Sequence, residues 1–146
     1  MKVKLETLLN GYPALERLAS LYLSGKLNFR NSRTLDTATG LKKTFDEANL
    51  VILKAYGAKP AGNGWSFPNA DKMEAYEAEI KPELEKEVEV YGERYELKSS
   101  SFDFSQLSGK QMMQLGWLVD FIDDAEEEEA KPAPKPAKAN KQRTAK

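Results

Sequence analysis

The longest amphipathic pattern in the chain is ATGLKKTFDEANLVILKAYG, residues 38–57. Apolar side chains recur there at alternating intervals of three and four residues, at Ala38, Leu41, Phe45, Ala48, Ile52 and Ala55. This spacing predicts one face of an α-helix that packs lengthwise on another helix. We expect the helix to span residues 28–56 and to stop at Gly57, because glycine readily adopts the left-handed conformation that follows a helix. The apolar run at residues 50–53 widens the apolar face of this helix and predicts that the helix packs against more than one neighbouring element.

A second amphipathic helix is predicted over residues 71–87. Its apolar positions are Met73, Tyr76, Ile80 and Leu84. Asn69 or Asp71 can cap its first turn, and Pro82 predicts a kink or a boundary inside it. The two helices are expected to form an antiparallel hairpin whose longer arm reaches about 40 Å.

The remaining elements are shorter. Leucines with helical spacing over residues 5–23 predict a short helix, a break at Gly11-Tyr12-Pro13 and a second helix from Pro13 to Leu23. Alternating apolar residues over 88–97 predict two short strands about a turn, and Phe102 and Phe104 continue the alternation. Ser108 is a candidate N-cap for a last helix with an apolar stripe at Met112, Leu115, Leu118 and Ile122. The predicted fold is mostly α (α+β): an antiparallel helical hairpin with a short N-terminal helical segment, a small β-hairpin and a C-terminal helix.

Composition narrows the function classes. The 146 residues include no His and no Cys, so imidazole catalysis, thiolate nucleophiles, disulfides and the usual zinc sites are excluded. No apolar run approaches the roughly 20 residues that span a bilayer, and we expect no signal peptide in the first residues. We therefore expect an intracellular protein without membrane contact, metal or cofactor.

The formal net charge of -1 conceals three unlike segments. Residues 1–119 carry equal numbers of acidic and basic side chains, residues 120–130 carry seven acids, and residues 131–146 carry six bases. The last segment is rich in Lys, Pro and Ala and cannot bury enough apolar surface to offset its ordering entropy. We expect a folded helical domain over residues 1–125 and a disordered, acidic then basic tail over residues 126–146.

The sequence contains three kinds of candidate site. The glutamates Glu74, Glu77, Glu79, Glu83, Glu85, Glu87 and Glu89 could serve an enzyme only if they converged across a cleft, and a solvated helix face is the preferred interpretation. Aromatic residues on loops are typical anchors of interfaces, so the protein-binding candidates are Trp65 and Phe67, in the turn-rich segment 58–69, and Tyr76. The Asn63-Gly64 pair in that segment predicts a hairpin or a tight turn. No catalytic, metal or cofactor-binding residue is assigned.

The basic tail is the candidate for nucleic acid. Its phosphate-binding candidates are Lys131, Lys135, Lys138, Lys141, Arg143 and Lys146. Six cations predict a salt-dependence slope of at most about −5 on double-stranded DNA. The neighbouring acidic block would compete for the tail, so a purely solubilising tail is an equal alternative.

Several short motifs, taken in order, resemble a known family. They are Leu8-Leu9-Asn10, Pro13-Ala14-Leu15, Leu18-Ala19, Lys26-Leu27, Phe45-Asp46-Glu47-Ala48, Tyr56-Gly57, Glu83-Leu84, Val88-Glu89-Val90 and Leu107-Ser108 to Leu115. Over about residues 3–122 the chain resembles small uncharacterised proteins encoded by tailed bacteriophages and prophages.

The resemblance implies synthesis in the host cytoplasm, with a place in the virion possible. It also implies a non-enzymatic accessory role through binding to a phage structural protein, a host protein or a second copy. The alternatives are a nucleic-acid-associated protein acting through the tail and, third, a carboxylate-dependent enzyme.

Overall fold

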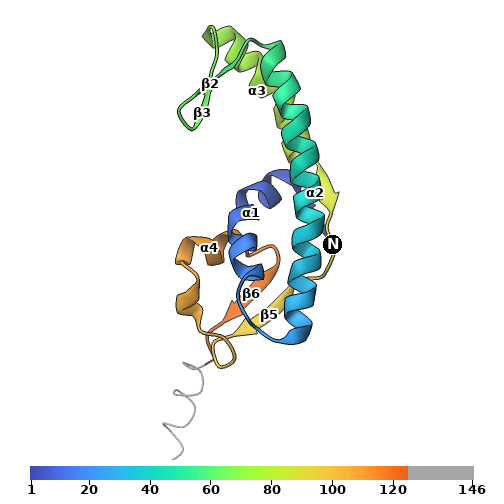
Figure 1. Cartoon of the computed structure of the whole chain (residues 1–146), viewed down its shortest axis with the longest axis vertical. Coiled ribbons are helices and arrows are strands. Elements are labelled where there is room, and N and C mark those ends of the chain that lie inside the picture. Colours follow the sequence, from blue (N-terminus) through green and yellow to red (C-terminus); the bar gives the residue numbers. More distant parts are fainter. Residues whose placement is uncertain (125–146) are drawn as a thin grey trace, which may run out of the picture. The chain divides into compact units, whose positions relative to one another are not determined.

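The computed structural model describes residues 1–124, and these residues group into two compact units (Figure 1). The first unit is Met1–Glu93 and the second begins at Arg94. The described parts of both units lie within the predicted folded domain, residues 1–125. The predicted tail over residues 126–146 lies outside the described residues.

The first unit is organised around the expected helical hairpin. Helix α2 (Gly25–Ala55) begins where the Ser24 side chain accepts a hydrogen bond from the Leu27 N–H, and it is followed by Gly57 at φ +77°. Helix α3 (Ala70–Glu85) begins at Asn69, whose side chain accepts from the Lys72 N–H. Figure 1 shows α3 returning alongside α2. The antiparallel hairpin and the cap at Asn69 are confirmed, and α3 continues through Pro82 to its end.

Helix α1 (Leu5–Ala19) is continuous, so the predicted break at Gly11-Tyr12-Pro13 and the extension to Leu23 are wrong. Proline removes one helical hydrogen bond at a cost of about 3 kcal/mol. Apolar side chains on both sides of Pro13 are buried, namely Leu5, Leu8, Ala14, Leu15 and Leu18. Burial of each leucine side chain stabilises the fold by about 1.5–3 kcal/mol. The four buried leucines together therefore outweigh the cost of the proline. Helix α1 packs against both α2 and α3.

The strands near residues 88–97 exist, but they do not pair with each other. Strand β4 (Glu87–Glu89) pairs antiparallel with β1 (Lys2–Lys4), a strand that the sequence did not predict. In this register Lys2 faces Glu89 and Lys4 faces Glu87, so unlike charges flank the apolar Val3 and Val88 pair. The predicted hairpin at residues 88–97 is therefore wrong in its pairing.

A small β-hairpin does occur in the connection between α2 and α3. Strand β2 (Lys59–Ala61) pairs antiparallel with β3 (Gly64–Ser66). The two residues at the tip are Gly62 and Asn63, one position earlier than the predicted Asn63-Gly64 turn. Gly62 has φ +59°, which glycine adopts without steric strain.

The second unit contains a parallel strand pair, β5 (Tyr95–Lys98) and β6 (Val119–Ile122). The connection between them holds a 3-10 helix, Phe104–Gln106, and α4 (Gly109–Gln114). A turn and this 3-10 helix replace the alternating strand predicted at Phe102 and Phe104, and the Phe104 ring packs edge-on against Phe121 at 5.5 Å.

The predicted C-terminal helix is present only in its first part. Ser108 forms a capping box with Gln111, which confirms the cap, but α4 ends at Gln114. Residues 119–122 instead add a strand to β5. Leu115 and Leu118, which belonged to the predicted helical stripe, are buried, but a turn lies between them. The same apolar residues therefore enter the core from a turn and not from a helix. The structure confirms the α+β class, with helices dominant and two-stranded sheets.

Candidate functional site

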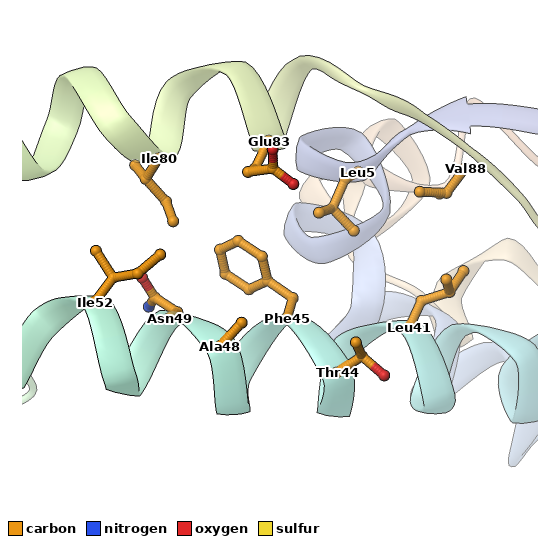
Figure 2. Close-up of a pocket in the computed structure, with 10 residues that line it drawn as sticks. All are labelled: Leu5, Leu41, Thr44, Phe45, Ala48, Asn49, Ile52, Ile80, Glu83 and Val88. Atoms are coloured by element: carbon orange, nitrogen blue, oxygen red, sulfur yellow. The ribbon is translucent and has the colours of Figure 1, made fainter.

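An open cleft of about 330 Å³ lies between α2 and α3 (Figure 2). Its lining comes from four elements of the first unit, namely Leu5 of α1, Leu41, Thr44, Phe45, Ala48, Asn49 and Ile52 of α2, Ile80 and Glu83 of α3, and Val88 of β4. Figure 2 shows Phe45 and Ile52 pointing from α2 towards Ile80 on α3. The predicted apolar face of α2 therefore forms one wall of a cleft and does not pack fully against its partner helix.

Small side chains contribute to the open space. Ala48 extends only a methyl group from the wall that also carries Phe45 and Ile52. Leu5 and Val88 lie at the end of the cleft where α1 and β4 approach the hairpin. A site with this lining can hold an apolar group of the size of a side chain or a small ligand, because transfer of apolar surface out of water drives such binding.

Two polar side chains of the cleft, those of Asn49 and Glu83, already have partners. The Asn49 Oδ1 accepts a 2.5 Å hydrogen bond from the Tyr76 hydroxyl, and the Glu83 carboxylate pairs with Lys86 at 2.7 Å. Burial raises the pKa of Tyr76, and the hydrogen bond to Asn49 opposes this rise. The amide of Asn49 therefore stabilises the hairpin, and what the cleft offers a ligand is mainly apolar surface.

The structure separates the three aromatic candidates. Trp65 lies on β3, opposite Pro60, and its side chain is 40% exposed. Phe67 and Tyr76 are half-buried and in contact, with ring centroids 5.3 Å apart. Trp65 is thus available to a partner, whereas the contact between Phe67 and Tyr76 fastens the segment after β3 to α3.

Further apolar side chains are exposed near the same end of the hairpin. Leu50 and Val51 lie in the last turns of α2, and Met73 lies in the first turn of α3. Val51 is 68% exposed, although Leu53 in the same run is buried and Ile52 lines the cleft. The broad apolar face predicted at residues 50–53 is therefore divided between core, cleft and solvent.

The seven glutamates of the enzyme alternative are all exposed. Glu79 accepts a hydrogen bond from the Tyr56 hydroxyl at 2.7 Å, which raises the pKa of Tyr56. Within residues 1–124, no three acidic side chains lie close enough together to hold a metal ion. No helix of this described part is long and apolar enough to cross a membrane.

The six phosphate-binding candidates of the tail, Lys131 to Lys146, lie outside the described residues. The described part contains a different basic surface, which the sequence did not single out. Lys26 and Arg30 of α2 line a groove with the loop at residues 91–93. Their spacing on one helix was visible in the sequence, but their neighbour Tyr91 is more than 50 residues away along the chain.

Comparison of the chain with protein-family models, curated proteins and solved structures finds no match. The assignment of function therefore depends on the geometry of the molecule and on the sequence resemblance described above.

Proposed function

We propose that this chain is a phage-encoded accessory protein that binds another protein, and that the α2–α3 hairpin is its binding element. The observation that supports this most strongly is the open apolar cleft between the two helices. An apolar side chain of the partner would enter the cleft beside Phe45 and Ile80. The phage origin and the host-cytoplasmic location rest on the sequence resemblance alone.

The hairpin has the features of an interface with a central anchor. Interface energy is concentrated in a few well-packed aromatic or apolar groups that fill pockets, surrounded by contacts that exclude water. The cleft supplies the pocket, and the exposed Trp65 and Val51 supply apolar contacts on the same hairpin. The capped helices hold these groups in place, which reduces the entropy lost on binding.

Filling the cleft tests this proposal. Ala48 lines the cleft and its small side chain is exposed, so Ala48→Phe should occupy the space without disturbing the core. We expect the tagged wild-type chain to recover a specific protein from phage-infected cells, and Ala48→Phe to lose most of it. Lys43→Gln is the control, because Lys43 is an exposed residue of the same helix that does not line the cleft.

A second variant separates the cleft from its surroundings. Trp65→Ser removes an exposed ring and leaves the cleft intact, so it should weaken recovery less than Ala48→Phe does. Equal recovery by the wild type, Ala48→Phe and Trp65→Ser would show that the hairpin is not the binding element.

A further inference from the structure

A second surface of the first unit combines positive charge with exposed aromatic rings. Lys26, Arg30 and Arg33 follow one another at intervals of four and three residues in the first turns of α2, so they form a stripe along one face of the helix. The stripe is about 10 Å long. Lys26 and Arg30 also line a groove of about 450 Å³ with Tyr91, Gly92 and Glu93.

Two aromatic side chains accompany this stripe. The Arg33 guanidinium lies over the Tyr91 ring, 5.7 Å from its centroid, and donates a hydrogen bond to the Tyr91 hydroxyl at 3.2 Å. Tyr91 is nevertheless 44% exposed. Phe29, three residues after Lys26 and four before Arg33, is 72% exposed. Positions with this spacing are neighbours on a helix surface, so an unpartnered ring lies beside two cations.

The loop that carries Tyr91 is held in place. The Thr34 hydroxyl donates to the Tyr91 carbonyl at 2.9 Å, and the Arg30 guanidinium donates to the Glu93 carbonyl at 3.2 Å. The Met1 ammonium donates to the Val90 carbonyl at 2.8 Å. The groove is therefore formed before any ligand binds, which lowers the entropic cost of binding.

We propose that this surface, defined by Lys26, Phe29, Arg30, Arg33 and Tyr91, binds single-stranded nucleic acid. The cations would contact phosphates, and the Phe29 and Tyr91 rings would stack on bases. The Arg33 guanidinium has five N–H donors and gives one to the Tyr91 hydroxyl, so donors are left for phosphate oxygens. The proposal is independent of the hairpin cleft and of the tail.

The aromatic rings distinguish this ligand from other polyanions. An acidic peptide would pair with the three cations, but its carboxylates make no favourable contact with the exposed Phe29 ring. Unpaired bases, by contrast, stack on aromatic faces whatever their sequence. Bases in a duplex are already stacked and their faces are not accessible. The surface therefore favours a single strand over both a duplex and an acidic protein segment.

One side chain of the groove opposes the ligand. Glu93 lines the groove, and its carboxylate would repel a phosphate. Glu93→Gln should therefore increase the affinity for nucleic acid by a few fold, whereas removal of the cations or of Phe29 should decrease it.

The test measures the fluorescence anisotropy of a labelled oligothymidylate of about 16 nucleotides, which is the upper site size for single-strand binding modules. The full-length chain is used, both as wild type and with the six tail bases replaced by glutamine. The triple variant Lys26→Gln/Arg30→Gln/Arg33→Gln should lose at least about 10-fold in affinity in both backgrounds. It should also lower the salt-dependence slope by about 2, for three phosphates on a single strand. The control triple, Lys43→Gln/Lys54→Gln/Lys59→Gln, removes the same charge from exposed positions elsewhere in the unit and should change little.

Phe29→Ala keeps every charge and should still weaken binding by about 10-fold, because a stacking contact is lost. Phe29 and Glu93 have exposed side chains, so their substitution should leave the fold intact. These two variants therefore test the proposal even if the triple variant fails to fold. The proposal is overturned if neutralising the tail alone abolishes binding, or if both triple variants weaken it equally. Equal binding of a duplex, or displacement by polyglutamate at the same charge concentration, would also overturn it.

Discussion

Gly92 has φ +109°, a conformation that side chains with a Cβ rarely adopt. A Cβ added there would lie 3.0 Å from the Thr34 Oγ1, which is buried and hydrogen-bonded to the Arg30 and Tyr91 carbonyls. Gly92→Ala is therefore expected to destabilise the fold by about 2 kcal/mol in chemical denaturation.

Gly40 is the matched control for Gly92. It lies inside α2 with open space around its added Cβ, so Gly40→Ala should stabilise the protein by about 0.5–1 kcal/mol. Effects of the same sign at the two glycines would contradict the described loop at residues 91–93.

Tyr76 provides a test of the hairpin interior. Burial raises its pKa above the ordinary 10.0, so its neutral form stabilises the folded state. This contribution is fully present below pH 10 and is lost as the pH rises through the folded-state pKa. The absorbance difference between the wild type and Tyr76→Phe should reveal a phenol that titrates above pH 10. In the same pH range, the stability of the wild type should fall more steeply than that of Tyr76→Phe. A phenol that titrates at or below pH 10 would place Tyr76 in solvent.

Helix α1 contains Pro13 and yet remains continuous, because its apolar side chains are buried in the core. Pro13→Ala restores a donor for the Leu9 carbonyl, worth about 3 kcal/mol, while it frees the unfolded chain by up to about 1 kcal/mol. We therefore expect a net gain of about 2 kcal/mol in the free energy of unfolding. A loss of stability would indicate that the proline ring itself packs in the folded state.

Helix positions and ends in the hairpin were predictable because their determinants are local. Spacing located α2, and the cap at Asn69 and the stop at Gly57 were read from single residues. The same holds for the Ser108 cap of α4 in the second unit. Strand pairing was not predictable, because β1 and β4 lie at opposite ends of the sequence of the first unit and each is only three residues long. Such short strands carry little pattern, and their register depends on tertiary contacts.

The candidate sites depend even more on tertiary structure. The sequence correctly placed Phe45, Ala48 and Ile52 on one face, but only the spacing of α2 from α3 shows that this face is partly open. Trp65 and Phe67 were both candidates for an exposed contact, and only Trp65 is exposed. The half-buried contact between Phe67 and Tyr76 could not be read from their positions. The basic stripe of α2 gains its meaning only from the distant Tyr91.

For the whole molecule, the net charge of -1 describes no particular surface. Helix α2 carries six bases and three acids, while residues 70–89 carry eight acids and three bases. The two arms of the hairpin therefore differ in sign, and the apolar cleft lies between them. Both proposed surfaces, the cleft for a protein and the basic stripe of α2 for nucleic acid, belong to the first unit.

Site-specific photocrosslinking in infected cells shows whether the α2–α3 cleft receives a protein partner, as we propose. A benzoylphenylalanine replaces Thr44, an exposed residue that lines the cleft, or Met113, an exposed residue of the second unit, as the control. We expect a discrete adduct of one partner from position 44 and none from position 113. Absence of an adduct at position 44, or the same adducts from both positions, would contradict this proposal.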